Sequence, residues 1–338
     1  MQTKYGRRLV TIPGMLLTAI ALAITAPILV PVLAVADLMT GWRRRRLLRL
    51  WAMASSYVWF ELVGITVSGV LWTLSGFGLL MHVRAIRRAH HRLHWWWTGS
   101  LVRAMQRFLA LELEIDGDLP HGRPLVVISR HCSFGDALLP SALLGEHHRY
   151  ELRHVLKREL VWDPCLDLVG NRLENHFVDR APDDNSSELE AIRSLAIGIR
   201  GAQAAVIFPE GTFRTPRRHE RAVERLRGRQ PHLADRAARM SHVLPPRPAG
   251  TGALLDAAPD ADVLILGHVG FESFSSFAEI IANVPFRAPV RIRYWLHERA
   301  TVPDDADARM AWLFEQWEHL DAWVASQRGP DPALRSDR

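Results

Sequence analysis

A long apolar run near the N-terminus constrains this chain more than any other feature. Leu9 to Met39 contains a single charged residue, Asp37. A helix needs roughly 20 apolar residues to cross ~30 Å of hydrocarbon, so the run is long enough to span a membrane. A cleaved signal peptide has an apolar stretch of only about 7 to 15 residues. The greater length, with interruptions at Pro13, Pro27 and Pro31, therefore indicates a retained membrane segment.

A second apolar run, Trp51 to Val83, predicts the other half of an N-terminal helical hairpin. Two topologies stay open for it. If both runs cross the membrane, the arginines at 43–46 and 49 lie on the opposite face from the N-terminus and the C-terminal part. This placement disagrees with the tendency of cationic loops to stay on the cytoplasmic side. A second segment that only dips into the bilayer avoids this and shelters Glu61. The tryptophans at 95–97 suit the headgroup level, and the adjacent histidines at 90, 91 and 94 are interpreted as part of that interfacial belt.

The charge is distributed unevenly along the chain. Up to residue 108, fourteen Lys and Arg stand against two acids, a balance of +12, while the whole chain carries +6. The remaining 230 residues therefore carry −6. Because the cations flank apolar runs, they favour anionic lipid as a partner over nucleic acid. We expect a cell-membrane protein whose larger C-terminal part faces the cytoplasm.

A globular domain is predicted from about residue 99. At roughly 150 residues per domain, 338 residues allow about two structural units. Short apolar runs alternate with helical patterns, which predicts an α/β sheet covered on both faces. The expected strands are 111–115, 124–129, 152–156, 176–178, 204–208, 262–268 and 290–296, and the expected helices are 135–144, 163–170, 186–200, 217–230, 249–257 and 305–325. The predicted domains are 1–98, membrane-anchoring helices; 99–328, the α/β domain; and 329–338, a flexible tail.

The two cysteines, Cys132 and Cys165, exclude a disulfide-stapled scaffold, and no CxxC pair suggests structural zinc. We find no cluster of acids and histidines typical of a metal hydrolase, so no metal is expected.

The segment SRHCSFGD contains the first candidate site. His131 and Asp136 follow the predicted strand 124–129, at the end where α/β sheets bind ligands. A carboxylate can fix the tautomer of such a histidine, which then takes a proton from an alcohol. Taken alone, an exposed loop histidine with Asp136 near a helix N-terminus explains the pattern as well.

The segment FPEGTFRT also follows an apolar strand. Pro209 and Gly211 predict a tight turn that exposes Glu210, Thr212 and Arg214. Backbone N–H groups of such a turn and an arginine fork suit a phosphate. An ordinary turn with solvated charges remains the alternative.

Two further segments place an arginine after a strand or in a rigid loop. HFVDR ends in Asp179 and Arg180, which a surface salt bridge also explains. VLPPRPAGTGA holds Arg247 among three prolines, which a proline-rich connector also explains.

In this order, HCSFGD, FVDR, FPEGT and VLPPR resemble the four blocks of the glycerolipid acyltransferase family, the 1-acyl-sn-glycerol-3-phosphate acyltransferases. The resemblance covers about residues 111 to 266, and the LPPR form is similar to that of the lysocardiolipin and lysophosphatidate branch. One departure is Arg130, where the family usually has Asn. The resemblance implies a mixed central sheet flanked by helices, following the hydrophobic hairpin.

The resemblance also implies transfer of a fatty acyl group from acyl-CoA, or acyl carrier protein, to a hydroxyl of a lysophospholipid, with 1-acyl-glycerol-3-phosphate as the first expected acceptor. His131 is then the general base and Asp136 its partner. The implied substrate-binding residues are Arg180, Glu210, Gly211, Thr212, Arg214 and Arg247. No cofactor is implied beyond the acyl donor. The alternatives are another acceptor, such as lysocardiolipin or a glycolipid, an inactive membrane scaffold, and a disfavoured acyl intermediate on Cys132.

Overall fold

A computed structural model describes residues 3–41, 44–119, 121–178 and 185–328 of the chain. The chain divides into two compact units that interleave along the sequence. The first unit comprises Met1–Glu112, Leu138–Pro182 and Phe277–Pro289. The second comprises Leu113–Ala137, Asp183–Ser276 and Val290–Arg338.

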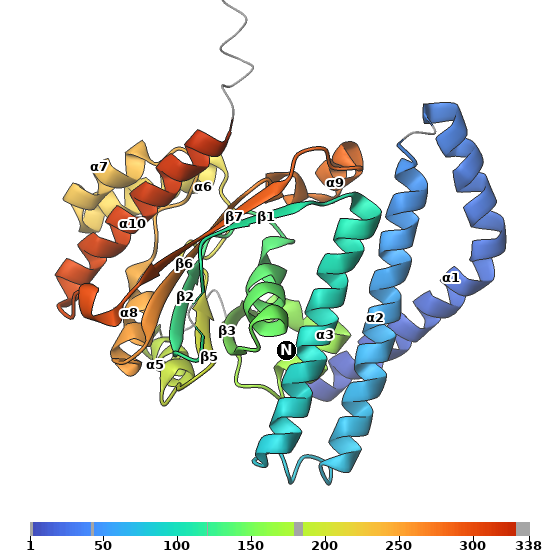
Figure 1. Cartoon of the computed structure of the whole chain (residues 1–338), viewed down its shortest axis with the longest axis horizontal. Coiled ribbons are helices and arrows are strands. Elements are labelled where there is room, and N and C mark those ends of the chain that lie inside the picture. Colours follow the sequence, from blue (N-terminus) through green and yellow to red (C-terminus); the bar gives the residue numbers. More distant parts are fainter. Residues whose placement is uncertain (1–2, 42–43, 120, 179–184, 329–338) are drawn as a thin grey trace, which may run out of the picture. The chain divides into compact units, whose positions relative to one another are not determined.

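Three long helices make up most of the first unit: α1 (Lys4–Gly41), α2 (Arg46–Leu74) and α3 (Arg84–Leu109). Each packs against the next one along the chain (Figure 1). Both α1 and α2 are long and apolar enough to cross a membrane. α1 continues through the three prolines that were expected to interrupt it, and it is bent, as proline's missing N–H allows (Figure 1).

The second apolar run stops being helical earlier than its sequence suggests. α2 ends at Leu74, and turns occupy Ser75 to Val83. Gly76, Phe77 and Gly78 have φ angles of 62°, 58° and 99°. These left-handed conformations cannot continue a right-handed helix, so the chain reverses there before α3 begins.

The interpretation of the Trp and His cluster as an interfacial belt is wrong. Trp95 and Trp97 are only 7% and 4% exposed, and the three histidines beside them are buried too. Trp97 Nε1 donates to Glu61 Oε1 at 2.8 Å, and Trp95 Nε1 donates to the carbonyl of Tyr150 at 3.0 Å. Each indole therefore has a protein partner inside the first unit.

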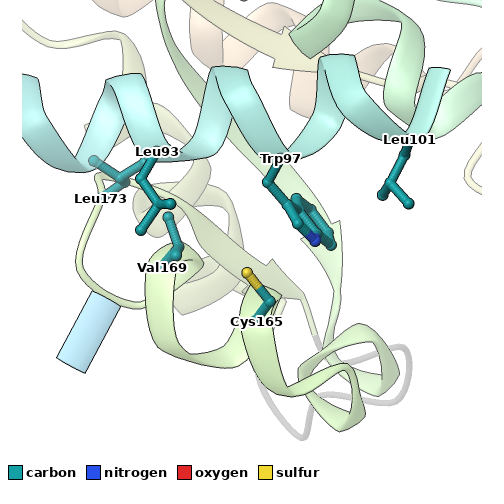
Figure 2. Packing of buried hydrophobic residues seen from close by; sticks show 6 residues of the cluster. All are labelled: Leu93, Trp97, Leu101, Cys165, Val169 and Leu173. Atoms are coloured by element: carbon teal, nitrogen blue, oxygen red, sulfur yellow. The ribbon is translucent and has the colours of Figure 1, made fainter. Parts of the chain in front are cut away.

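Figure 2 shows the apolar cluster that surrounds Trp97. Side chains of α3 face those of α4 (Pro164–Gly170) and the residues that follow it, and the cluster comprises Leu93, Trp97, Leu101, Cys165, Val169 and Leu173. Glu61 lies beside it, fully buried, with its second oxygen accepting from the backbone N–H of Cys165 at 3.0 Å. Protein donors therefore satisfy this buried carboxyl group, and the two topologies of the hairpin stay predictions.

The remaining elements of the first unit are short. Strands β3 (Glu151–Lys157) and β4 (His176–Val178) pair in parallel. The helices and helical turns are η2 (Ser141–His147), η3 (Arg158–Trp162) and α9 (Phe277–Asn283). The predicted helix 135–144 is thus replaced by η2 and a short turn before it, η1 (Asp136–Leu138).

Five strands form the sheet of the second unit, in the order β1-β7-β6-β2-β5. Their bounds are β1 (Leu113–Asp116), β2 (Leu125–Ser129), β5 (Gln203–Ile207), β6 (Asp262–Val269) and β7 (Val290–His297). β2 pairs in parallel with β5 and β6, whereas β6 and β7 are antiparallel. Every residue of β2 and β6 is buried, which explains their continuous apolar sequences. The prediction of a mixed α/β sheet is confirmed.

Helices flank this sheet. α8 (Pro248–Ala257) packs on β2 and β5, α10 (Ala306–Gln327) packs on β6, and α5 (Asn185–Ala196) packs on α8. α6 (Pro216–Arg229) and α7 (Pro231–Arg239) pack together. α7 was not predicted. The division predicted between residues 98 and 99 lies within α3, and the predicted domain functions stay predictions.

Candidate active site

Three parallel strands of the second unit bring the candidate residues to one edge of the sheet. His131 follows β2, Glu210 follows β5, and His268 lies near the end of β6, with Glu272 just beyond it. Because β2 is parallel to both neighbours, all three carboxyl ends face the same edge.

His131 and Asp136 form a hydrogen-bonded pair. His131 Nδ1 and Asp136 Oδ1 are 2.8 Å apart, and the carboxylate is fully buried. Burial alone raises the pKa of Asp136, but the hydrogen bond and charge of His131 outweigh it, and the net shift is downward. An ionised carboxylate can only accept, so Nδ1 carries the proton and Nε2 is left as the basic nitrogen.

The loop around Asp136 is shaped to hold this pair. Asp136 Oδ2 also accepts from the backbone N–H groups of Cys132 at 2.5 Å and Ser133 at 2.8 Å. A Cβ on Gly135 would lie 2.8 Å from the Phe271 ring, so only glycine fits there. The four-residue spacing between His131 and Asp136 therefore produces a closed turn in which the carboxylate meets three donors.

Glu210 differs from the expectation of an exposed residue, because it is only 2% exposed. Its Oε1 accepts from the backbone N–H of His131 and its Oε2 from that of Leu244, both at 2.9 Å. Burial raises its pKa to about 7, although Arg130 and the two N–H groups oppose that shift. Glu210 thus joins the backbone of His131 to the proline-rich loop, and its carboxylate is committed to protein donors.

Arg130, the residue that departs from the family pattern, is buried beneath the site. Its guanidinium donates to the carbonyls of His268 and His242 and to Glu272 Oε1 at 3.0 Å. Arg328 also bonds Glu272, at 2.6 Å. Burial raises the pKa of Glu272, but these two arginines lower it to about 2, so it stays ionised. Arg130 therefore ties β2 to β6 through a paired charge.

His268 is a second buried histidine close to the pair. Its Nε2 lies 3.0 Å from the carbonyl oxygen of Arg130 and 3.6 Å from Asp136 Oδ2. Burial lowers the pKa of His268, so the neutral ring donates to that carbonyl. Sequence reasoning missed His268 and Glu272. The polar end of the apolar run 262–268 was the available signal for His268, whereas nothing local marks Glu272.

Aromatic rings surround the imidazole of His131. The ring centres of Phe208 and Phe213 lie 4.9 Å and 4.6 Å from it, and Phe134 contacts Phe213 edge-on at 5.1 Å. Phe134 is 57% exposed. The candidate base thus has an apolar surrounding that continues to the surface.

The turn after β5 has cations beside it. Gly211 has a φ of 68°, and its N–H donates to the carbonyl of Phe208 at 3.0 Å. A Cβ on Gly211 would lie 3.2 Å from the Arg247 guanidinium, so this arginine lies against the turn. Arg214 is partly buried, and its Nε is buried with no hydrogen-bond partner among the described residues. Burial lowers the pKa of Arg214. Thr212 is half-buried beside them.

The structure thus brings together His131, Asp136, Glu210, Gly211, Thr212, Arg214 and Arg247. Asp179 and Arg180 lie outside the described residues, so the predicted role of Arg180 stays a prediction.

Cys132, Asp136 and His268 each have a potential metal-binding atom, all within 4.8 Å of one another. This trio is poorly suited to a metal. Both oxygens of Asp136 already accept hydrogen bonds, and burial raises the pKa of the Cys132 thiol well above its usual value, which disfavours the thiolate a metal needs. The same protonated thiol is a poor nucleophile.

One family of known proteins matches the part of the chain that holds this site. Residues 111–237 match the Acyltransferase family. This span contains His131, Asp136 and the turn from Glu210 to Arg214, and it ends before Arg247. No curated protein sequence matches the chain. Among solved structures, the chain is similar to the 1-acyl-sn-glycerophosphate (LPA) acyltransferase PlsC from Thermotoga maritima, with 14% identity and a TM-score of 0.48, covering 80% of this chain and 98% of that one.

Proposed function

We propose that this protein is a membrane-bound O-acyltransferase that moves a fatty acyl group from a thioester donor to the hydroxyl of a lysophospholipid, with 1-acyl-glycerol-3-phosphate as the first acceptor to test. The observation that carries the proposal is the His131–Asp136 pair, held at 2.8 Å within the segment that matches the Acyltransferase family. The lysocardiolipin-like form of the fourth block makes lysocardiolipin the second acceptor to test.

The chemistry follows from the free nitrogen of His131. Nε2 takes the proton of the acceptor hydroxyl while its oxygen attacks the thioester carbonyl carbon. The tetrahedral intermediate then collapses, the C–S bond breaks, and the departing thiolate takes the proton from His131. The products are an ester and a free thiol, and no covalent enzyme intermediate is needed.

Binding of the acceptor phosphate is assigned to the cations of the turn after β5. Arg214, with a buried Nε that has no partner among the described residues, and Arg247, against Gly211, supply charge-assisted donors. Arg180 is assigned to the same phosphate because FVDR resembles the second block of the acyltransferase family. Membrane attachment is assigned to α1 and α2, which are long and apolar enough to span, with the catalytic domain on the cytoplasmic face of the cell membrane.

A substrate panel tests the proposal. Purified full-length protein is given an acyl-CoA or acyl carrier protein donor together with lysophosphatidate, lysocardiolipin, neutral lysolipids, a glycolipid or glycerol-3-phosphate. We expect thiol release that depends on a lysophospholipid and is matched by new ester. Thiol release without ester would indicate a thioesterase. No thiol release from either donor would favour the scaffold alternative.

A further inference from the structure

A basic face on α6 lies directly after the turn that contains Arg214. The helix has six arginines and two glutamates, whereas residues 109–338 as a whole carry −6. At 100° per residue, four of the arginines fall within an arc of about 100°. We call them the α6 arginine face: Arg217, Arg218, Arg221 and Arg225, all of which are exposed.

The other sides of α6 are occupied. Val223 is buried, Leu226 is half-buried, and His219 Nε2 lies 3.0 Å from the carbonyl of Ala237 in α7. Glu224, at the edge of the face about 20° from Arg217 around the helix, pairs with Arg227 at 2.6 Å. By contrast, none of the four arginines of the face has a carboxylate partner among the described residues. Their charge is therefore available to an external anion.

The α6 arginine face begins at the candidate active site. Arg218 Nη1 donates to the carbonyl of Phe213 at 3.0 Å, and the Phe213 ring lies 4.6 Å from that of His131. From Arg217 to Arg225 the face extends about 12 Å along the helix. The N-terminal end of the face therefore contacts a residue whose ring packs on the candidate base.

We propose that the α6 arginine face docks an acidic carrier protein that presents the acyl thioester on a flexible arm, an inference that rests on the proposed function. The four arginines are spread over about 12 Å and have no carboxylate partners among the described residues. They match a row of carboxylates on a protein better than a single phosphate, because one or two arginines are enough to hold a phosphate. A membrane surface fits less well, because the exposed positions between 216 and 228 include no large apolar side chain.

The test compares two donors that bear the same acyl chain, one on acyl carrier protein and one on CoA, with full-length protein and one acceptor. The variant is Arg217→Glu/Arg221→Glu. The matched control is Arg200→Glu/Arg239→Glu, which reverses two exposed arginines of the same unit outside the face. We expect the variant to lower kcat/KM for the carrier-bound donor about tenfold or more relative to the CoA donor at low ionic strength, and the control to leave that ratio unchanged. The difference should shrink as salt shortens the screening length from about 30 Å at 0.01 M to about 3 Å at 1 M.

The inference would be overturned if the arginine variant lost kcat/KM equally with both donors, or lost none. It would also be overturned if the wild-type protein used only the CoA donor. The same holds if the variant lost binding to anionic vesicles while its kinetics with both donors stayed unchanged. Fluorescence anisotropy of labelled acyl carrier protein gives a second readout that needs no turnover. If the wild-type protein transfers no acyl group from either donor, the proposed function fails. In that case the docking surface would still be supported if the wild-type protein binds the carrier protein and the arginine variant binds it more weakly.

Discussion

Replacing Asp136 by Asn tests how the candidate base is held. The carboxylate accepts from three donors, His131 Nδ1, the Cys132 N–H and the Ser133 N–H. An asparagine side chain has one oxygen and one NH2 group, so it cannot accept on both sides. If its oxygen keeps the two backbone N–H groups, its NH2 faces Nδ1. The imidazole must then carry its proton on Nε2, which can no longer act as a base.

Two magnitudes follow from this geometry. Loss of general base catalysis lowers kcat by about 10² to 10⁴, equivalent to about 3 to 5 kcal/mol in the activation barrier. The opposite orientation of the substituted amide sets its NH2 against backbone donors and costs about 1 to 3 kcal/mol of folding free energy. Both estimates apply to a carboxylate that is fully buried, where water cannot substitute for the missing acceptor.

The assay is the initial rate of thiol release at saturating donor and acceptor, with chemical unfolding measured in the same detergent. We expect a large loss in kcat with little change in either KM, because Asp136 makes no proposed substrate contact. A folded Asp136→Asn protein that keeps more than a tenth of the wild-type kcat would refute the role of this carboxylate in setting the tautomer.

Four further outcomes are expected. Folding raises the pKa of Glu210 from 4.5 to about 7, so the protonated side chain adds about 3 kcal/mol to the free energy of unfolding below pH 4.5. This contribution is lost as pH rises through 7. Denaturant titrations should show the decrease in unfolding free energy in the wild type and not in Glu210→Gln. Cys132→Ser should keep kcat within about threefold, and loss of activity would restore the covalent alternative. Arg214→Gln should chiefly raise the acceptor KM, with only partial rescue by Lys, whereas a change in donor KM alone would reassign this arginine. Leu17→Arg/Ile24→Arg should make the protein extractable by carbonate, since each arginine costs about 2.5 to 3.5 kcal/mol in a spanning helix, and unchanged extraction would mean that α1 does not span.

The sequence predicted the elements that depend on local patterns. Each apolar run proposed as a strand is a strand, because buried strands need continuous apolar residues and their ends need polar or Gly-Pro sequences. The spacing of His131 and Asp136 alone left their pairing open, and the resemblance to the four acyltransferase blocks implied it; the two side chains are 2.8 Å apart.

The sequence failed where a partner lies far away in the chain. Glu210 appeared exposed because its turn looks solvated, yet its two acceptors serve His131 and Leu244. The histidines and tryptophans of α3 looked interfacial because they follow a run rich in cations. His90, His91, His94, Trp95 and Trp97 are buried, and Trp97 donates to Glu61, which is 36 residues away. No local pattern records such contacts.

The central claim is that His131 removes the acceptor's proton in an acyl transfer. The most direct measurement is the rate at which radiolabelled acyl groups pass from the donor to lysophosphatidate, compared between wild type and His131→Ala, with matched unfolding curves showing that both are folded. We predict ester formation by the wild type and a loss of about 10² to 10⁴ in His131→Ala. A folded His131→Ala protein that retains more than a tenth of the wild-type rate would contradict the mechanism.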